Sequence, residues 1–226
     1  MINSRYNNNM KLTVYTPGTV PYEEALEWQY ELVEKRRNQE INDCLILLQH
    51  PPVLTTGRRK QEHNILIDAQ SMDIPVIRTN RGGEVTYHGP GQLVGYLIVD
   101  LAAFSRRVKQ FVFNLEEVFV RFLDREYGIR ADRYDKHRGV WVGNDKITAI
   151  GLAIEREITM HGFAFNINTD LEHFKWIVPC GISDKGVTSL EKLTGKTQDL
   201  EALIPRIAEI YKEVYSYDSM EIIHGR

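Results

Sequence analysis

The sequence contains little cysteine and no long apolar run. Its 226 residues include only two cysteines, Cys44 and Cys180, and no CxxC pair, so neither a disulfide framework nor a zinc knuckle is indicated. No apolar run approaches the roughly 20 residues that span a bilayer, and residues 1–9 lack the apolar core of a secretory signal. These absences predict a protein of a reducing compartment, the cytoplasm, with no membrane partner.

The sequence also lacks an excess of either charge. It has 28 Lys and Arg against 31 Asp and Glu, and the formal net charge of -3 implies no global attraction to nucleic acid. The composition is 42% hydrophobic and 26% charged, which is ordinary for a globular protein. Nucleic-acid binding is therefore not expected.

A single α+β domain is predicted for residues 11–217. Residues 1–10 are expected to be a disordered N-terminus, with Met10 as an alternative start, and residues 218–226 a C-terminal tail. Helical patterns cover residues 21–38, 108–127 and 199–215, with a short turn of helix at 189–193. Strand-like runs cover residues 12–15, 44–48, 76–78, 92–100, 139–142, 147–154 and 159–166. Because hairpin-like strands follow one another and helices come only at intervals, the pattern favours α+β over a doubly wound sheet.

Each of the three longer helices is predicted to bury one stripe of side chains. The first stripe is Tyr22, Leu26, Tyr30 and Val33; the second is Phe111, Leu115, Val118, Phe119 and Phe122; the third is Leu203, Ile207, Ile210 and Val214. The segment Gly143-Asn144-Asp145 is predicted to be a hairpin turn between two strands.

The glycine-rich segment RGGEVTYHGPGQ, residues 81–92, is the densest candidate for chemistry. Four glycines in twelve residues allow positive φ angles and close approach of a ligand, and free N–H groups in such a loop can bind a carbonyl, a thioester or a phosphate. The segment is neither a phosphate-binding P-loop nor a GxGxxG motif. A pair of glycine turns between strands is about an equally good reading of the composition.

Lys146 and Cys180 form a second candidate pair. Lys146 follows the predicted hairpin turn and opens a strand of small and apolar residues, and Cys180 stands between Pro179 and Gly181, outside helix and strand. Taken singly, such a lysine is more often a solvated surface residue and such a cysteine more often structural. Together they suffice for thioester exchange, because a nearby ammonium favours the thiolate. Cys44 opens the apolar run 44–48 and is expected to be an inert buried thiol.

Four segments in this order resemble the lipoyl(octanoyl) transferases, the octanoyltransferases of the lipoate pathway. The segments are RGGEVTYHGPGQ, DKITAIGL, HGFAFNIN and PCGI, preceded by QHPPVLTTG at residues 49–57. The resemblance runs from about residue 50 to residue 195. It implies a fold similar to the catalytic domain of biotin and lipoate protein ligases, with a mixed, mostly antiparallel sheet flanked by helices.

The resemblance also implies roles for individual residues. Cys180 matches the nucleophile that carries the acyl thioester, and Lys146 matches the lysine that lowers the pKa of that thiol. The substrate-binding positions carried over are Arg81, Gly82, Gly83, Glu84, Val85, Thr86, Tyr87, His88, Ala149, Ile150, Gly151, Gly162, Phe163 and Ala164. The small residues among them would leave room for an acyl tail, although close packing of core strands explains small residues equally well. A chemical role for His88 and a structural hydrogen bond for His161 stay open.

The implied partners are octanoyl-acyl carrier protein as donor and two kinds of acceptor. The acceptors are the lipoyl domains of 2-oxoacid dehydrogenase E2 subunits and the glycine cleavage H protein; a monomer without cofactor or metal is expected. Acyl carrier protein is acidic, so a local basic patch is expected at residues 58–60 or 106–109, though such clusters are more commonly solvated. Two other functions stay open: an ATP-dependent lipoate or biotin ligase, which needs no thiol, and a non-catalytic module that binds an acyl chain or a carrier domain.

Overall fold

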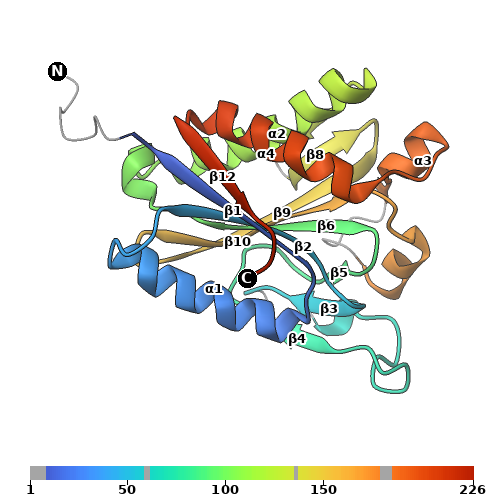
Figure 1. The fold of residues 1–226 in the computed structure, drawn as a ribbon. Coiled ribbons are helices and arrows are strands. Elements are labelled where there is room, and N and C mark those ends of the chain that lie inside the picture. The colour runs from blue at the N-terminus through green and yellow to red at the C-terminus, as the bar shows by residue number, and fades with distance from the viewer. Residues whose placement is uncertain (1–8, 59–61, 135–136, 179–184) are drawn as a thin grey trace.

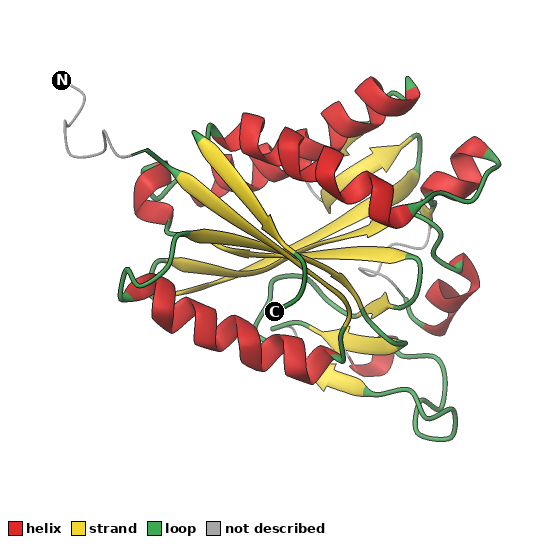
Figure 2. Cartoon of the chain, in the orientation of Figure 1, coloured by secondary structure: helices red, strands yellow, loops and turns green. Residues whose placement is uncertain are grey.

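The computed structural model describes residues 9–58, 62–134, 137–178 and 185–226. A large twisted sheet crosses the molecule, and helices cover both of its faces (Figures 1 and 2). The strand order is β12-β1-β2-β6-β10-β9-β8-β7, with β11 beside β9. The strands are β1 (Lys11–Thr19), β2 (Asp43–Gln49), β6 (Gln92–Ile98), β7 (Asp132–Tyr134), β8 (His137–Val142), β9 (Asp145–Glu155), β10 (Ile158–Asn166), β11 (Gly186–Val187) and β12 (Ser219–Ile223).

The large sheet is mixed and mostly antiparallel, as the sequence predicts. Strands β12, β1 and β2 run parallel to one another, as do β11 and β9, whereas every pair from β2 through β6, β10, β9 and β8 to β7 is antiparallel. A smaller sheet has the order β4-β3-β5 and comprises β3 (Val53–Thr56), β4 (Val76–Arg78) and β5 (Thr86–His88). Its strand β5 lies inside the glycine-rich segment, so the smaller sheet determines where that segment runs.

The longer helices lie on opposite faces of the large sheet (Figure 1). Helix α1 (Tyr22–Arg37) covers one face, and α2 (Val108–Tyr127) and α4 (Leu200–Tyr215) cover the other; α3 (Leu190–Thr194) precedes α4. Short 3-10 helices are η1 (Glu62–Asn64), η2 (Leu101–Phe104) and η3 (Leu171–Trp176). No described helix has the length and apolarity that a bilayer crossing requires.

The core on the α2 face forms as the helical periodicity predicts. Phe111, Leu115, Val118, Phe119 and Phe122 are all buried. The ring of Phe119 lies 4.6 Å from that of Phe163 on β10. Burial of each such side chain contributes about 1.5–3 kcal/mol, so the apolar stripe of α2 is sufficient to hold this helix against the sheet.

The predicted buried face of α1 is partly wrong. Tyr30 is 44% exposed, whereas Ala25, Trp28 and Leu32 are buried. Trp28 turns inward because its ring packs edge-on against Tyr15 of β1, at a centroid distance of 5.3 Å. The inward face is therefore rotated from the predicted stripe, although the helix itself is correctly placed.

The predicted C-terminal tail contains a strand. Residues 219–223 form β12, which pairs in parallel with β1 from Lys11 to Tyr15. Thr13 of β1 also donates a 3.0 Å hydrogen bond to Glu221. The folded sheet therefore extends beyond residue 217, and residues 1–8 lie outside the part of the chain that the structure describes.

Candidate active site

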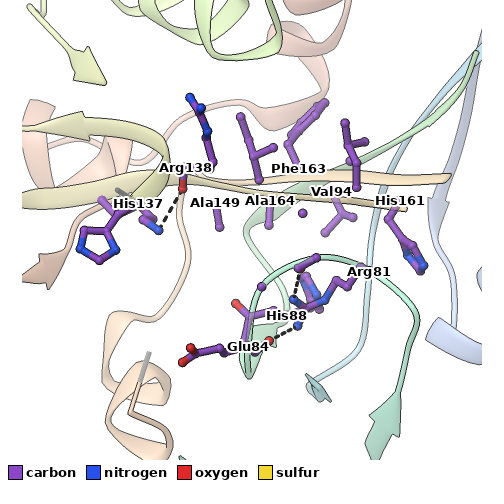
Figure 3. Close-up of a pocket in the computed structure, with 18 of the residues that line it drawn as sticks. Arg81, Glu84, His88, Val94, His137, Arg138, Ala149, His161, Phe163 and Ala164 are labelled. Carbon is purple, nitrogen blue, oxygen red and sulfur yellow. Dashed lines mark hydrogen bonds between the residues drawn. The ribbon is translucent and has the colours of Figure 1, made fainter. Parts of the chain in front are cut away.

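A cavity of about 680 Å³ is lined by the glycine-rich segment, by strands β6, β8, β9 and β10, and by residues of α1 and α2. Figure 3 shows the floor formed by strands β9 and β10, with the loop that carries Arg81 and Glu84 opposite it. Most substrate-binding positions predicted from the sequence line this cavity: Arg81, Gly82, Gly83, Glu84, Val85, Thr86, His88, Ala149, Ile150, Gly151, Gly162, Phe163 and Ala164. Lys146 lines it as well.

Tyr87 is the predicted position that does not line the cavity. Its side chain is buried on the other side of β5, where its hydroxyl hydrogen-bonds the Nδ1 of His173 at 2.7 Å. Alternation along a strand places Tyr87 opposite to Thr86 and His88, which do face the cavity. Tyr87 therefore anchors the strand rather than contacting the cavity.

Arg81 holds the glycine-rich segment in place. Its guanidinium is buried, with 8% of the residue exposed, and donates to the backbone oxygens of Thr55 at 2.8 Å and Glu84 at 2.7 Å. A further hydrogen bond of 3.1 Å reaches the oxygen of Gly82. Because one rigid, planar group joins three backbone carbonyls, the loop has a fixed shape before any substrate binds.

The loop approaches β9 too closely for side chains. The N–H of Gly82 donates to the oxygen of Leu152 at 2.9 Å, and a Cβ on Gly151 would lie 2.7 Å from the oxygen of Gly82. At Gly57, a Cβ would lie 2.2 Å from the oxygen of Gly83. Glycine at positions 57 and 151 is therefore a steric requirement of the loop position.

The cavity floor is built from small side chains on paired strands. Ala149 of β9 is registered with Ala164 of β10, and Gly151 with Gly162. Figure 3 shows Ala149, Ala164 and Val94 pointing toward the loop, whereas Phe163 points to the opposite face of the sheet. Small residues on the inward face leave room, and the Phe163 ring on the outward face closes the sheet against α2.

His88 is neutral and its ring nitrogens are both engaged. The amide nitrogen of Gln92 donates to Tyr87 and Asn166, so its oxygen accepts from the Nδ1–H of His88 at 2.8 Å. The other ring nitrogen lies 3.4 Å from the hydroxyl of Thr55. Burial lowers the pKa of His88 well below its usual value. These contacts fix the orientation of the His88 ring in the cavity wall.

Two further histidines beside the cavity are also neutral. Burial, with a contribution from the Arg81 cation, lowers the pKa of His161 to about 3. Nε2 of His161 is 2.8 Å from the side-chain oxygen of Asn80, which supports the structural hydrogen bond that the sequence left open. Burial lowers the pKa of His50 to about 4. The inner end of the cavity is thus polar, but its histidines carry no charge near neutral pH.

Lys146 presents its ammonium at the cavity beside the hairpin turn. The turn itself forms as predicted, with Gly143 at a φ of 59° and β9 starting at Asp145. The Nζ of Lys146 donates to the backbone oxygen of Arg138 at 3.1 Å and lies 4.7 Å from the centre of the Trp141 ring. An acceptor and an aromatic face both favour the charged ammonium.

Cys180, the predicted nucleophile, lies outside the described residues. The chain is described again from Lys185, and Val187 of β11 pairs with Lys146 in parallel register. The N–H of Thr188 donates to the oxygen of Lys146 at 3.0 Å. Val187 and Thr188, which follow Cys180 by seven and eight positions in sequence, therefore lie directly beside Lys146. The other cysteine, Cys44, is buried as predicted, and burial raises the pKa of its thiol to about 12.

The two basic clusters differ in position. Arg58 lines the cavity and donates to the backbone oxygen of Asn80 at 2.8 Å, whereas Arg59 and Lys60 lie outside the described residues. Arg106 forms an ion pair with Glu157 at 2.5 Å. Of the described basic residues in these clusters, Arg58 lines the cavity; in the second cluster the lining residue is the apolar Val108.

Sequence reasoning missed several residues that line the cavity. They include Tyr22, Tyr96, His137, Arg138, Trp141 and Lys185. They come from α1, β6, β8 and the segment that precedes β11, and no local motif marks them. Only the assembled sheet, with α1 packed on it, brings these residues together.

Comparison with known proteins matches this chain over most of its length. The family model described as the lipoyl protein ligase A/B catalytic domain matches residues 21–212. An octanoyltransferase of Caldicellulosiruptor bescii is 51% identical over 210 residues, covering 91% of this chain and 92% of the relative. An octanoyltransferase of Desulforamulus reducens is 46% identical over 220 residues, covering 96% of each chain.

Solved structures with a similar fold are lipoate protein ligases. A bipartite lipoate protein ligase of Thermoplasma acidophilum has a TM-score of 0.73 at 14% identity, covering 95% of this chain and 86% of that one. A lipoate-protein ligase A bound with ATP has a TM-score of 0.69 at 13% identity, covering 96% and 90%. These likenesses confirm the predicted ligase-like fold, and the sequence matches confirm the predicted family. The chain belongs to the octanoyltransferase family, within the lipoyl protein ligase A/B catalytic-domain family, and is an acyltransferase.

Proposed function

We propose that this protein transfers an octanoyl group from octanoyl-acyl carrier protein to a lysine of a lipoyl domain, through a thioester on Cys180. This is the first step of endogenous protein lipoylation. The observation that carries the proposal is one cavity that joins a fixed glycine-rich loop, a floor of small residues and the Lys146 ammonium. The choice of octanoyl as the transferred group rests on the relatives that are named octanoyltransferase.

The proposed chemistry has two steps. The Cys180 thiolate attacks the thioester carbonyl, a bond forms between sulfur and carbonyl carbon, and the carrier leaves as a thiol after taking a proton from the Lys146 ammonium. The lysine amine of the acceptor then attacks the Cys180 thioester, and neutral Lys146 accepts the proton that the amine releases. Cys180 returns as thiolate and Lys146 as ammonium, so the cycle closes without ATP.

The cavity suits a medium-length acyl chain. Its volume of about 680 Å³ lies within the roughly 300–1,000 Å³ common for small-molecule sites. Ala149, Gly151 and Ala164 provide an apolar strip along which an acyl tail can lie. At the other wall, residues 81–88 have their shape fixed by Arg81, and we assign this segment to the thioester end of the substrate.

The Lys146 position supports its part in this chemistry. Its ammonium is held against Arg138 and Trp141, and the described residues after position 184 return beside it. An ammonium next to a thiol favours the thiolate, because the pKa of an ordinary cysteine near 8.5 leaves only a few per cent ionised at neutral pH.

The proposed partners follow from the reaction. The donor is octanoyl-acyl carrier protein, and the acceptors are lipoyl domains of 2-oxoacid dehydrogenase E2 subunits and the glycine cleavage H protein. We propose that the protein acts on them as a monomer in the cytoplasm. Arg58, which lines the cavity and belongs to a basic cluster, is the described residue that we propose meets the acidic carrier.

A transfer assay tests the proposal. Purified protein is mixed with octanoyl-acyl carrier protein and a lipoyl domain, without ATP, and the mass of the lipoyl domain is followed. We expect octanoylated lipoyl domain from the wild type and none from Cys180→Ser. Transfer only from free octanoate with ATP would make the protein a ligase, and binding of the octanoyl carrier without product would make it a binding module.

A further inference from the structure

One peptide group beside the cavity is held from both ends. The peptide that joins Arg138 to Gly139 gives its oxygen to the Nζ of Lys146 at 3.1 Å and its N–H to the Oε1 of Glu116 at 3.0 Å. Glu116 comes from α2, Arg138 and Gly139 from β8, and Lys146 from β9.

The orientation of this peptide depends on glycine. Gly139 has a φ of 130°, which side-chain-bearing residues rarely adopt, and a Cβ there would lie 2.3 Å from the backbone oxygen of Thr148. The same Cβ would lie 3.4 Å from the Cδ and Cε atoms of Lys146. The pairing of β8 with β9 shifts its register between Val140 and Trp141, so the strand becomes irregular shortly after this peptide.

Glu116 is placed to act on this peptide. It is fully buried on α2, whose other buried residues are apolar, and its second oxygen lies 3.7 Å from the guanidinium of Arg138 and 3.9 Å from that of Arg133. Burial of a carboxylate costs free energy unless its oxygens accept hydrogen bonds or face cations. An apolar side chain would pack the helix against the strand without this cost, so the glutamate points to a polar role.

We propose that Glu116 is a positioning residue for Lys146 and acts through the 138–139 peptide. A carboxylate that accepts the N–H of a peptide polarises it and increases the negative charge on the carbonyl oxygen. The oxygen of Arg138 thereby becomes a stronger and better-oriented acceptor for the Lys146 ammonium. The inference rests on the proposed function only in stating that Lys146 acts in acyl transfer.

The test compares Glu116→Gln with the wild type. Glutamine keeps an oxygen for the Gly139 N–H and so preserves the fold, but removes the negative charge. The matched control is Glu117→Gln, the neighbouring residue on α2, whose carboxylate binds Arg121 and Arg133. A second pair is Gly139→Ala against Gly143→Ala; both glycines have positive φ, but a Cβ at position 143 meets nothing within 4 Å.

Two readouts are measured on each variant. The first is the rate at which acetic anhydride modifies Lys146, followed by peptide mass spectrometry; the second is kcat and KM for octanoyl transfer. For Glu116→Gln we expect several-fold faster acetylation of Lys146 and a kcat about tenfold lower, with little change in KM. Gly139→Ala should show the same pattern, and both controls should behave like the wild type.

The acetylation rate of Lys146 can be measured whether or not the protein transfers octanoyl groups. If the wild type transfers no octanoyl group, the proposed function fails, while the rate of Lys146 modification still reports whether Glu116 acts on the ammonium. Unchanged acetylation in Glu116→Gln overturns the inference, whether or not kcat falls. The expected rise in acetylation, absent in Glu117→Gln, supports it.

Discussion

The backbone N–H of Gly82 donates a 2.9 Å hydrogen bond to the carbonyl oxygen of Leu152. This bond joins the glycine-rich segment to the outer part of the β9–β10 hairpin, two parts of the chain that are 70 residues apart in sequence. It fixes the distance between the glycine-rich segment and Gly151 of β9. The size of the cavity therefore depends on the absence of a side chain at one position of β9.

Replacement of Gly151 by alanine is expected to displace the loop. The new Cβ would lie 2.7 Å from the oxygen of Gly82, so either the loop or the strand must shift. We expect kcat/KM for octanoyl transfer to fall roughly tenfold or more, with an unfolding free energy about 1–3 kcal/mol lower. Gly18→Ala serves as the control for activity: a Cβ there meets nothing within 4 Å, and although its φ of 78° costs some stability, kcat/KM should stay at the wild-type value. Full activity in Gly151→Ala would show that the loop position does not matter.

Replacement of Ala164 by valine is expected to change the choice of acyl chain. Ala164 faces the cavity from β10, and two added methyl groups would occupy part of the floor (Figure 3). Octanoyl transfer should fall about tenfold relative to butanoyl transfer, measured with both donors in competition. Ala153→Val is the matched control, since Ala153 is buried on β9 without lining the cavity. Equal loss for both chain lengths would place the acyl tail elsewhere.

Replacement of Lys146 by alanine is expected to make acyl-enzyme formation depend steeply on pH. Without the ammonium, the thiolate is scarce at neutral pH, so formation should fall about a hundredfold at pH 7 and recover in part above pH 9. Lys185→Ala is the control, because its ammonium also faces the Trp141 ring, at 5.2 Å. Loss of the Lys185 ammonium should change the rate of acyl-enzyme formation only slightly. Loss of activity in Lys146→Ala without recovery at high pH would assign the lysine another role.

His50 is expected to make the protein less stable in acid. Its Nδ1 lies 2.6 Å from the oxygen of Val20 and its Nε2 lies 2.7 Å from the hydroxyl of Tyr96. The folded-state pKa is lowered to about 4, so the unfolded chain binds more protons between pH 4 and 6.5. The stabilisation is complete above pH 6.5 and is lost as the pH falls toward 4, at about 1.4 kcal/mol per pH unit.

Urea unfolding at pH 7.5 and pH 5.0 tests this linkage. In His50→Gln, the stability difference between the two pH values should be about 2 kcal/mol smaller than in the wild type. His63→Gln, at an exposed position, should leave that difference unchanged. The same pH dependence in His50→Gln and wild type would mean that His50 is not kept neutral by the fold.

Elements with strong local signals were predictable from the sequence. Helix α2 spans Val108–Tyr127 as predicted, because its apolar stripe repeats regularly and Gly128 ends it at a φ of 64°. The Gly143 turn and the long strands β9 and β10 were placed for the same reason. Local pattern was sufficient wherever the partner of a segment lies nearby in sequence.

Elements whose partners are distant were not predictable. Strand β12 pairs with β1 across more than 200 residues, and although its burial alternates, a run of five residues is too short a signal to mark a strand by itself. The inward face of α1 depends on where Trp28 meets Tyr15. Both features follow from the assembled sheet rather than from any local sequence preference.

The candidate site divides in the same way. Residues 81–88 and the floor positions of β9 and β10 came from the family resemblance, and the structure places nearly all of them around one cavity. Glu116 and Tyr96 were missed, because a buried glutamate in a helix and a tyrosine in an apolar strand carry no motif. Their place at the site depends on how α2 packs on β8 and β9, and on the position of β6 beside β10 in the same sheet.

The intact mass of the protein after reaction with octanoyl-acyl carrier protein tests the central claim most directly. The wild type should gain the mass of one octanoyl group, located by peptide mapping on Cys180, and should lose it again when a lipoyl domain is added. Cys180→Ala should gain nothing and transfer nothing. Octanoyl transfer by Cys180→Ala at the wild-type rate, without any acyl-enzyme in the wild type, would contradict the account.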